Sequence, residues 1–190
     1  DLAAILQRLE KIGSHPKDLH QHATLPRASV LVPLFLRRRQ NKSQTDDELS
    51  DVVHVLLTQR PISLRTHAGE VCFPGGKQDP EDGNDDVVTA LREAWEEVGL
   101  ASNLVRPLCR LDTLESYTGL CVTPIVGWVG PHEPTVTAAA VEPLRLTINH
   151  DEVEDAFAVP LEYFANDANL SEPKQIVEWR GGFFEMRTYH

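Results

Sequence analysis

One segment of the chain, residues 85–98, limits the possible folds more than any other. Its sequence, DDVVTALREAWEEV, contains neither proline nor glycine, and Gly99 follows it where helices commonly end. At about 100° per residue, one face of such a helix carries apolar side chains and roughly the opposite face carries glutamates. The apolar set is Val88, Leu91, Trp95 and Val98, and the acidic set is Glu93, Glu96 and Glu97. The spacing therefore predicts a helix over 85–98 with one apolar face and one acidic face.

The acidic face of this helix is unusual because its carboxylates repel one another, at a cost of roughly a few tenths of a kcal/mol per pair. A solvated helix face would tolerate that cost, but the preceding turn favours another interpretation. The sequence FPGGKQDPEDG, residues 73–83, can bring backbone N–H groups close to a phosphate. Carboxylate oxygens suit Mg²⁺, which commonly also binds substrate phosphates. Together the two features indicate a magnesium site that binds phosphate.

The rest of the chain is dominated by strand patterns, with a second helix predicted over 1–12 and a helical turn over 161–165. Strands are expected at 28–36, 52–58, 71–76, 104–114, 120–129, 153–159, 175–179 and 183–189. Loops are expected at 13–27, 37–51 and 130–143. Many strands around one strong helix predict the α+β class. We divide the chain into an N-terminal helix and loop, 1–27, and one domain, 28–190.

Composition limits the partners and the setting of the protein. A formal net charge of −11 disfavours nucleic acid, because a polyphosphate backbone would be repelled. No apolar run approaches the roughly 18 residues that cross a membrane, so no membrane partner is expected. The three cysteines, Cys72, Cys109 and Cys121, are widely spaced and odd in number, which favours core positions in a reducing compartment. We expect an intracellular monomer or homodimer, with peroxisomal, mitochondrial and cytoplasmic locations left open.

The helix and the turn before it resemble the Nudix box. That motif is a glycine, five residues, a glutamate, seven residues, and then Arg-Glu-apolar-x-Glu-Glu-x-Gly-apolar. Here the glycine is Gly76, and residues 92–100 match the second half at every defined position. Asp82 replaces the usual glutamate, and nine residues rather than seven separate it from Arg92. The resemblance implies the Nudix fold, a mixed β-sheet sandwiched between α-helices.

The resemblance also implies roles for the acidic residues. Glu93 and Glu97 would be the main ligands of Mg²⁺ or Mn²⁺, with Glu96 a third or water-mediated ligand. Arg92 would orient a neighbouring carboxylate through a charge-assisted hydrogen bond. The predicted catalytic residues are therefore Glu96, Glu97 and Arg92, with Glu96 as the candidate general base.

Residues 56–76, LLTQRPISLRTHAGEVCFPGG, are similar to LLTxRSxxxRxxxGxVxFPGG, a signature of the coenzyme A diphosphatase branch of that family. Pro61 replaces the serine, and the other defined positions fit. The implied reaction is hydrolysis of the diphosphate bond of coenzyme A (CoA) or acyl-CoA to 3′,5′-ADP and (acyl-)4′-phosphopantetheine. The predicted substrate-binding residues are Arg60, Arg65, His67, Gly75, Gly76 and Lys77. Guanidinium groups at 60 and 65 would suit the phosphates of CoA.

Two alternatives remain open. The first is a Nudix pyrophosphatase acting on another nucleoside diphosphate derivative, such as ADP-ribose, NADH, a dinucleoside polyphosphate or an oxidised nucleotide. The signature from Arg60 to Gly76 argues against it. The second is a catalytically silent Nudix module that binds a nucleotide. The three intact glutamates argue against this alternative, because a module without catalysis has no need to tolerate their repulsion.

Overall fold

The computed structural model describes residues 2–12, 25–38, 51–64, 67–130, 144–170, 175–179 and 182–186. Its helices are α1 (Leu2–Ile12) and α2 (Asp86–Val98). Its strands are β1 (Arg27–Arg38), β2 (Asp51–Gln59), β3 (Val71–Cys72), β4 (Gly75–Lys77), β5 (Val105–Arg110), β6 (Leu114–Glu115), β7 (Cys121–Val129), β8 (Asp155–Pro160), β9 (Gln175–Trp179) and β10 (Gly182–Met186). Short 3-10 helices are η2 (Pro80–Asp82), η3 (Ser102–Leu104), η4 (Leu161–Ala165) and η5 (Asp167–Asn169).

These bounds confirm the predicted order of helices and strands. The strand expected at 71–76 is divided into β3 and β4, with Pro74 between them, and the strand expected at 104–114 is divided into β5 and β6. Strands β1 and β2 extend farther than predicted, so the ends of the expected loops at 27, 37–38 and 51 are strand instead. The predicted loops otherwise fall largely on 13–24, 39–50 and 131–143, outside the described residues. No helix in the described part of the chain is long and apolar enough to cross a membrane.

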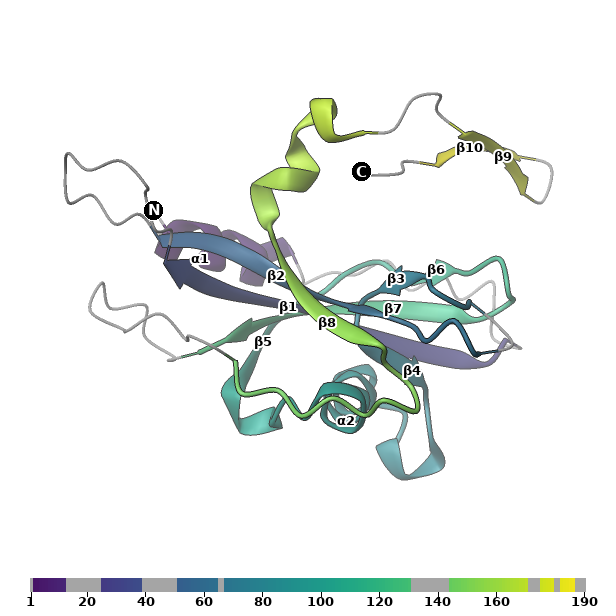
Figure 1. Cartoon of the computed structure of the whole chain (residues 1–190), viewed down its shortest axis with the longest axis horizontal. Coiled ribbons are helices and arrows are strands. Elements are labelled where there is room, and N and C mark those ends of the chain that lie inside the picture. The colour runs from purple at the N-terminus through teal and green to yellow at the C-terminus, as the bar shows by residue number, and fades with distance from the viewer. Residues whose placement is uncertain are drawn as a thin grey trace.

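One mixed sheet forms the centre of the fold (Figure 1). Strands run in the order β3-β2-β1-β7-β5, while β8 pairs with β2, β4 with β1 and β6 with β7. The central β1–β7 pair is parallel, and the other pairs in this sheet are antiparallel. Leu31 and Ile125 are partners in the parallel pair, and both are fully buried. Long β-branched and aliphatic runs favour such a doubly covered strand pair.

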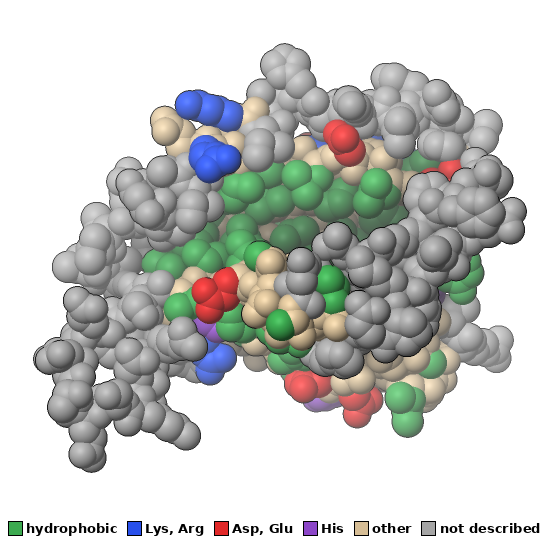
Figure 2. Space-filling view, turned by 90° about the horizontal axis from the view of Figure 1, so that it is seen from above, with side chains coloured by type: hydrophobic (Ala, Val, Ile, Leu, Met, Phe, Trp, Pro, Cys, Tyr) green, Lys and Arg blue, Asp and Glu red, His purple; other side chains and the backbone are tan. Residues whose placement is uncertain are grey.

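The two helices cover opposite faces of this sheet, which confirms the predicted sandwich (Figure 1). On one face, Ala90, Ala94 and Val98 of α2 pack into a core cluster with Leu31 and Ile125. On the other face, Leu6 of α1 joins a cluster that includes Leu34, Val55 and Trp128. Viewed from above, hydrophobic side chains gather in a band across the molecule (Figure 2). The boundary between 27 and 28 stays a prediction.

The predicted apolar face of the central helix is only partly the face that packs on the sheet. Val98 is fully buried, whereas Val88 and Trp95 are 44% and 57% exposed. The buried residues of α2 are Asp86, Thr89, Ala90, Ala94, Glu97 and Val98. The small side chains at 90 and 94 let the helix approach the sheet closely, and the buried polar groups have partners. The helix thus turns part of its acidic face inward, which the apolar periodicity alone does not reveal.

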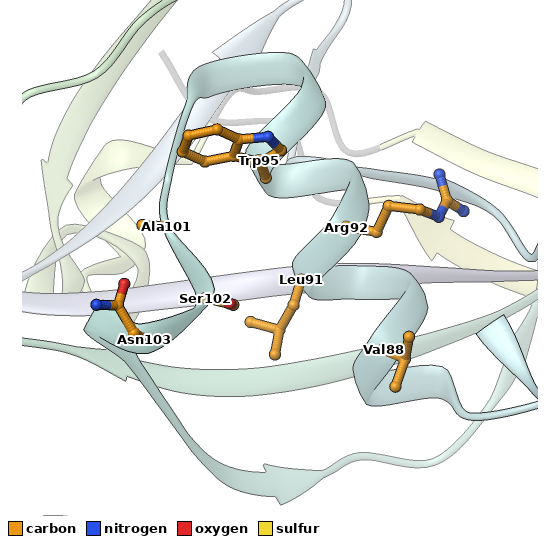
Figure 3. A pocket seen from close by; sticks show the side chains of 7 residues that line it. All are labelled: Val88, Leu91, Arg92, Trp95, Ala101, Ser102 and Asn103. Atoms are coloured by element: carbon orange, nitrogen blue, oxygen red, sulfur yellow. The ribbon is translucent and has the colours of Figure 1, made fainter. Parts of the chain in front are cut away.

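The outward face of α2 borders a groove of about 600 Å³. Figure 3 shows Leu91 and Trp95 pointing from α2 toward the segment that carries Ala101, Ser102 and Asn103. Glu97 is 2% exposed and lies on a different face of the helix. The groove and the predicted metal ligands are therefore on different sides of α2.

The first turn of α2 is fixed to the sheet by a buried carboxylate. Asp86 is 5% exposed and forms ion pairs with Arg27 of β1 at 3.1 Å and Arg110 of β5 at 2.9 Å. Ser29 Oγ also donates to Asp86 Oδ1 at 3.2 Å. The Asp85 side chain caps the helix by accepting from the backbone N–H of Val87 at 2.8 Å. These contacts set the position of every functional residue farther along the helix.

The three cysteines are free. Cys109 and Cys121 are buried, which confirms their predicted core positions. Cys72 is only half-buried, because the two-residue strand β3 pairs with β2 alone and lies at the edge of the sheet. Its Sγ lies 3.2 Å from Thr58 Oγ1 on the neighbouring strand.

Candidate metal and substrate site

Glu97 is the most buried of the predicted metal ligands. Its Oε2 accepts a hydrogen bond of 3.1 Å from the backbone N–H of Gly75, in the glycine turn that crosses above the helix. The pKa of Glu97 is raised to about 7, mainly by burial and in part by the nearby charges of Glu93 and Glu152, while the hydrogen bond from Gly75 acts in the lowering direction. A carboxylate buried this way gains when a cation arrives, because neutralisation removes the cost of its desolvated charge.

Glu93 packs directly under Gly76. A side chain added at residue 76 would place its Cβ 2.6 Å from Glu93 Oε1 and in contact with Oε2. A larger residue at 76 would therefore displace the Glu93 carboxylate from its present position. Burial is also the main cause that raises the pKa of Glu93, partly offset by the adjacent Arg92. The role of Gly75 and Gly76 in substrate binding stays a prediction.

Arg92 connects the carboxylates to the turn. Its Nε donates to Asp82 Oδ1 and its Nη2 to Asp82 Oδ2, both at 2.9 Å. Its Nη1 donates to Glu93 Oε1 and to Glu96 Oε2, both at 3.0 Å. A further bond of 3.0 Å links Nη2 to the carbonyl oxygen of Lys77. The expected orientation of a neighbouring carboxylate by Arg92 thus extends to two glutamates.

Asp82 serves as the anchor of this guanidinium. It is 4% exposed, and it also accepts bonds of 2.9 Å from Thr89 Oγ1 and from the Asp79 backbone N–H. The bidentate Arg92 contact holds the pKa of Asp82 well below its usual range, and the pKa of Arg92 is raised in return. The two additional residues after Asp82 are accommodated by left-handed backbone at Gly83 and Asn84, with φ of 65° and 63°. The longer spacing therefore preserves the ion pair.

The donor set fits a hard divalent cation. The buried Glu97 and the partly buried Glu93, both with raised pKa values, lie beside a third carboxylate, Glu96, whose side chain is 48% exposed. Oxygen donors of this kind suit Mg²⁺ or Mn²⁺. Among the described residues, no three acidic, histidine or cysteine side chains already converge as a ready metal cluster. The reason is visible in the contacts: Arg92 holds Glu93 and Glu96, while Gly75 holds Glu97.

Glu152 is a nearby carboxylate that the sequence reasoning did not select. Its charge contributes to the raised pKa values of both Glu93 and Glu97. Two backbone hydrogen bonds fix its segment beside α2. The N–H of Asn149 donates to the carbonyl oxygen of Glu97 at 2.9 Å, and the N–H of Glu152 donates to the carbonyl oxygen of Asn149 at 3.1 Å. The acidic run Asp151–Glu154 was a signal that could have drawn attention to this position.

Arg60 is the cationic residue among the predicted substrate residues whose charge acts on Glu97. Its positive charge lowers the pKa of Glu97 against the other effects. Its Nε is buried, and no acceptor in the described part of the chain lies within hydrogen-bond reach. A buried cationic donor without a partner is costly unless a ligand satisfies it. Arg60 is thus suited to an anionic ligand beside Glu97.

The remaining predicted substrate residues are less closely tied to the carboxylates. Lys77 has an exposed side chain, and its carbonyl oxygen rather than its ammonium contacts Arg92. His67 Nδ1 lies 2.7 Å from Glu70 Oε2, in the loop between β2 and β3. Arg65 lies outside the described residues. The structure therefore brings Glu93, Glu97, Gly75, Gly76, Arg92 and Arg60 together and leaves Lys77 at the margin.

The fold and the site define an α+β domain in which a glycine turn lies on a carboxylate helix. The NUDIX domain family matches residues 25–180, so the chain belongs to the Nudix hydrolase family. It is 37% identical over 145 residues to peroxisomal coenzyme A diphosphatase NUDT7 of Mus musculus, covering 76% of this chain and 51% of that protein. It is 39% identical over 145 residues to NudL of Yersinia pestis (strain Pestoides F), an uncharacterized Nudix hydrolase, covering 75% and 60%.

The chain therefore spans between half and two thirds of the length of these two curated relatives. Among solved structures it is similar to a C. elegans Ap4A hydrolase in a binary complex, with a TM-score of 0.47 and 20% identity. That similarity covers 72% of this chain and 81% of the other.

Asp82→Asn tests the anchoring of Arg92. Removing one partner of a buried ion pair leaves an uncompensated charge, so we expect a loss of about 3 kcal/mol in the free energy of unfolding at pH 7, measured with urea. The contribution of Asp82 is present above its ordinary pKa of 3.8 and is lost as the pH falls below it. The difference in unfolding free energy between the variant and the wild type should therefore become smaller at acidic pH.

Asp79→Asn is the matched control, because this carboxylate is 56% exposed and lies 3.8 Å from Arg92. Its loss should change the unfolding free energy by no more than about 0.5 kcal/mol. Equal destabilisation by the two substitutions would show that Asp82 has no special anchoring role.

Proposed function

We propose that this chain hydrolyses the diphosphate bond of CoA and acyl-CoA with the help of Mg²⁺ or Mn²⁺, releasing 3′,5′-ADP and (acyl-)4′-phosphopantetheine. The observation that carries the proposal is Arg60, whose charge acts on Glu97 and whose buried Nε has no hydrogen-bond partner within the part of the chain that the structure describes. Arg60 belongs to the segment 56–76 that resembles the CoA diphosphatase signature. The mouse relative whose name describes that activity supports the same substrate.

Glu93 and Glu97 would hold the cation, with Glu96 as a further ligand. When bound, a divalent cation neutralises charge on the diphosphate and favours attack by water. Arg92 keeps Glu93 and Glu96 oriented through its two Nη1 contacts. Arg60 would bind the 3′-phosphate of CoA, because a guanidinium group presents paired donors that suit phosphate oxygens.

Either Glu96 or Glu152 would accept the proton of the attacking water. Glu96, the residue selected from the sequence, already has one carboxylate oxygen occupied by a hydrogen bond of 3.0 Å from Arg92 Nη1. Glu152 has an exposed side chain and acts electrostatically on both predicted ligands. The arrangement favours Glu152.

Glu97→Gln tests the metal site in two independent ways. With Mg²⁺, we expect turnover of CoA to fall by roughly a hundredfold or more, read by the mass of the two products. Without metal, the protonated form of Glu97 favours the folded state, because its pKa is raised to about 7 from an ordinary 4.5. This contribution to the free energy of unfolding is fully present below pH 4.5 and is lost as the pH rises through 7. In EDTA the variant should therefore melt at a higher temperature than wild type at pH 8 and at nearly the same temperature at pH 5. A variant no more stable at pH 8 would contradict the burial of this charge.

Glu152→Gln and Glu96→Gln identify the base. We expect kcat for CoA to fall roughly a hundredfold in Glu152→Gln and clearly less in Glu96→Gln, with unchanged melting temperatures as the folding control. Glu154→Gln is the matched control, because its exposed carboxylate follows in the same segment. A larger loss in Glu96→Gln would return the role to Glu96.

Arg60→Ala tests the choice of substrate. Loss of a charge-assisted contact to the 3′-phosphate should lower kcat/KM for CoA by about tenfold or more, with a smaller effect on ADP-ribose, which has no such phosphate. Arg106→Ala, which removes a guanidinium 3.9 Å from Glu10 of α1, is the matched control and should affect neither substrate. Equal losses on CoA and ADP-ribose would favour another nucleoside diphosphate derivative as the substrate.

A further inference from the structure

Two aromatic side chains from separate hairpins meet beside the proposed site. His67 lies in the loop that joins β2 to β3, and Tyr117 lies in the turn that joins β6 to β7. Their ring centroids are 6.0 Å apart and the ring planes are inclined by 75°, an edge-to-face contact. Tyr117 is 74% exposed, so most of its ring surface is open to a ligand. Aromatic rings held in place but left open provide a stacking surface.

The position of His67 is maintained at some cost to the backbone. Its φ of 56° lies in the left-handed region that residues other than glycine seldom adopt. The imidazole Nδ1 lies 2.7 Å from Glu70 Oε2, and the backbone N–H of Glu70 donates to the His67 carbonyl oxygen at 3.3 Å. With Nδ1 directed at the carboxylate, Nε2 is the ring nitrogen left to face a ligand. Strain maintained by specific contacts is a common property of binding sites.

This aromatic pair is connected to the proposed catalytic residues by the loop itself. Arg60 closes the loop, because its N–H donates to the Glu70 carbonyl oxygen at 2.9 Å and its carbonyl oxygen accepts from Gly69 N–H at 3.1 Å. Cys72 follows directly in β3, and the charges of Glu97, Arg60 and Glu70 all act on its thiol. The carboxylate that contacts His67 and the carboxylate that would hold the cation are therefore both near the thiol of Cys72.

We propose that Tyr117 and His67 form the subsite for the nucleobase of the substrate, with the base stacked on Tyr117 and His67 Nε2 facing its edge. This inference rests on the proposed function and adds to it the place where the adenine is bound. A phosphate is the less suitable occupant, because Glu70, which is 59% exposed, would repel it. A neutral planar base escapes that repulsion and gains from the open ring.

The test measures binding and turnover separately. Isothermal titration of the whole chain with 3′,5′-ADP reports binding of a base, and titration with 4′-phosphopantetheine reports binding of the part that lacks one. Tyr117→Ala should weaken binding of 3′,5′-ADP about tenfold and leave 4′-phosphopantetheine unaffected. KM for CoA should rise by a similar factor while kcat changes little. Tyr117→Phe, which keeps the ring, should restore most of the affinity.

Leu104→Ala is the surface control, because this side chain is 49% exposed in η3. It should change neither affinity, and melting temperatures of all variants should match wild type. Unchanged binding of 3′,5′-ADP in Tyr117→Ala would overturn the proposal, as would undetectable binding to wild type. A selective loss of 4′-phosphopantetheine binding would also overturn it, since the aromatic pair would then contact the other half of CoA. If CoA is not cleaved but 3′,5′-ADP binding depends on Tyr117, the proposed function fails and the base subsite stands.

Discussion

The ion pair between Arg92 and Asp82 is the interaction on which the site depends. Asp82 is almost completely buried and uses both oxygens on the guanidinium, so the arginine has one fixed orientation. From that orientation Nη1 reaches Glu93 and Glu96, and Nη2 reaches the backbone of the glycine turn. One cation therefore fixes the position of two carboxylates and joins the helix to the turn. Without Asp82, the guanidinium of Arg92 would lose the buried contact that fixes its orientation relative to Glu93 and Glu96.

The same packing explains why part of the acidic face of α2 turns inward. Ala90 and Ala94 permit close approach to the sheet, and the turn at Gly75 and Gly76 covers the glutamates. A chain that needed only stability would place Trp95 inside and Glu97 outside, because a buried carboxylate carries a large desolvation cost. The opposite arrangement is typical of functional sites, where local rules are broken for the benefit of a ligand. The raised pKa values of Glu93 and Glu97 are the electrostatic consequence of this packing.

Sequence reasoning predicted the order of elements, the sheet between two helices and the residues of the helix and turn, because periodicity and turn chemistry are local properties. Periodicity did not show which face of α2 packs on the sheet, since that face is built around the small Ala90 and Ala94 and not around the largest apolar side chains. Sequence reasoning did not select Glu152 or Tyr117, because each lies near its partners only through pairing of segments far apart in the chain. It noted the altered spacing after Asp82 but not its ion pair with Arg92, which depends on left-handed residues that no periodicity reveals.

The contacts of the carboxylates also limit the repulsion among them. Glu93 and Glu96 share Arg92 Nη1 as a donor, whereas Glu97 accepts from the backbone N–H of Gly75. The shared positive charge offsets the repulsion between Glu93 and Glu96, and the separate donor holds Glu97 against the turn. Arg92 supplies one positive charge for two of them, and the third remains the most perturbed. The unfavourable desolvation of a carboxylate is therefore greatest at Glu97, where the charge of Arg60 also acts, and among the described residues Arg60 Nε has no hydrogen-bond partner. This is where the arrangement is best suited to receive both a cation and a phosphate.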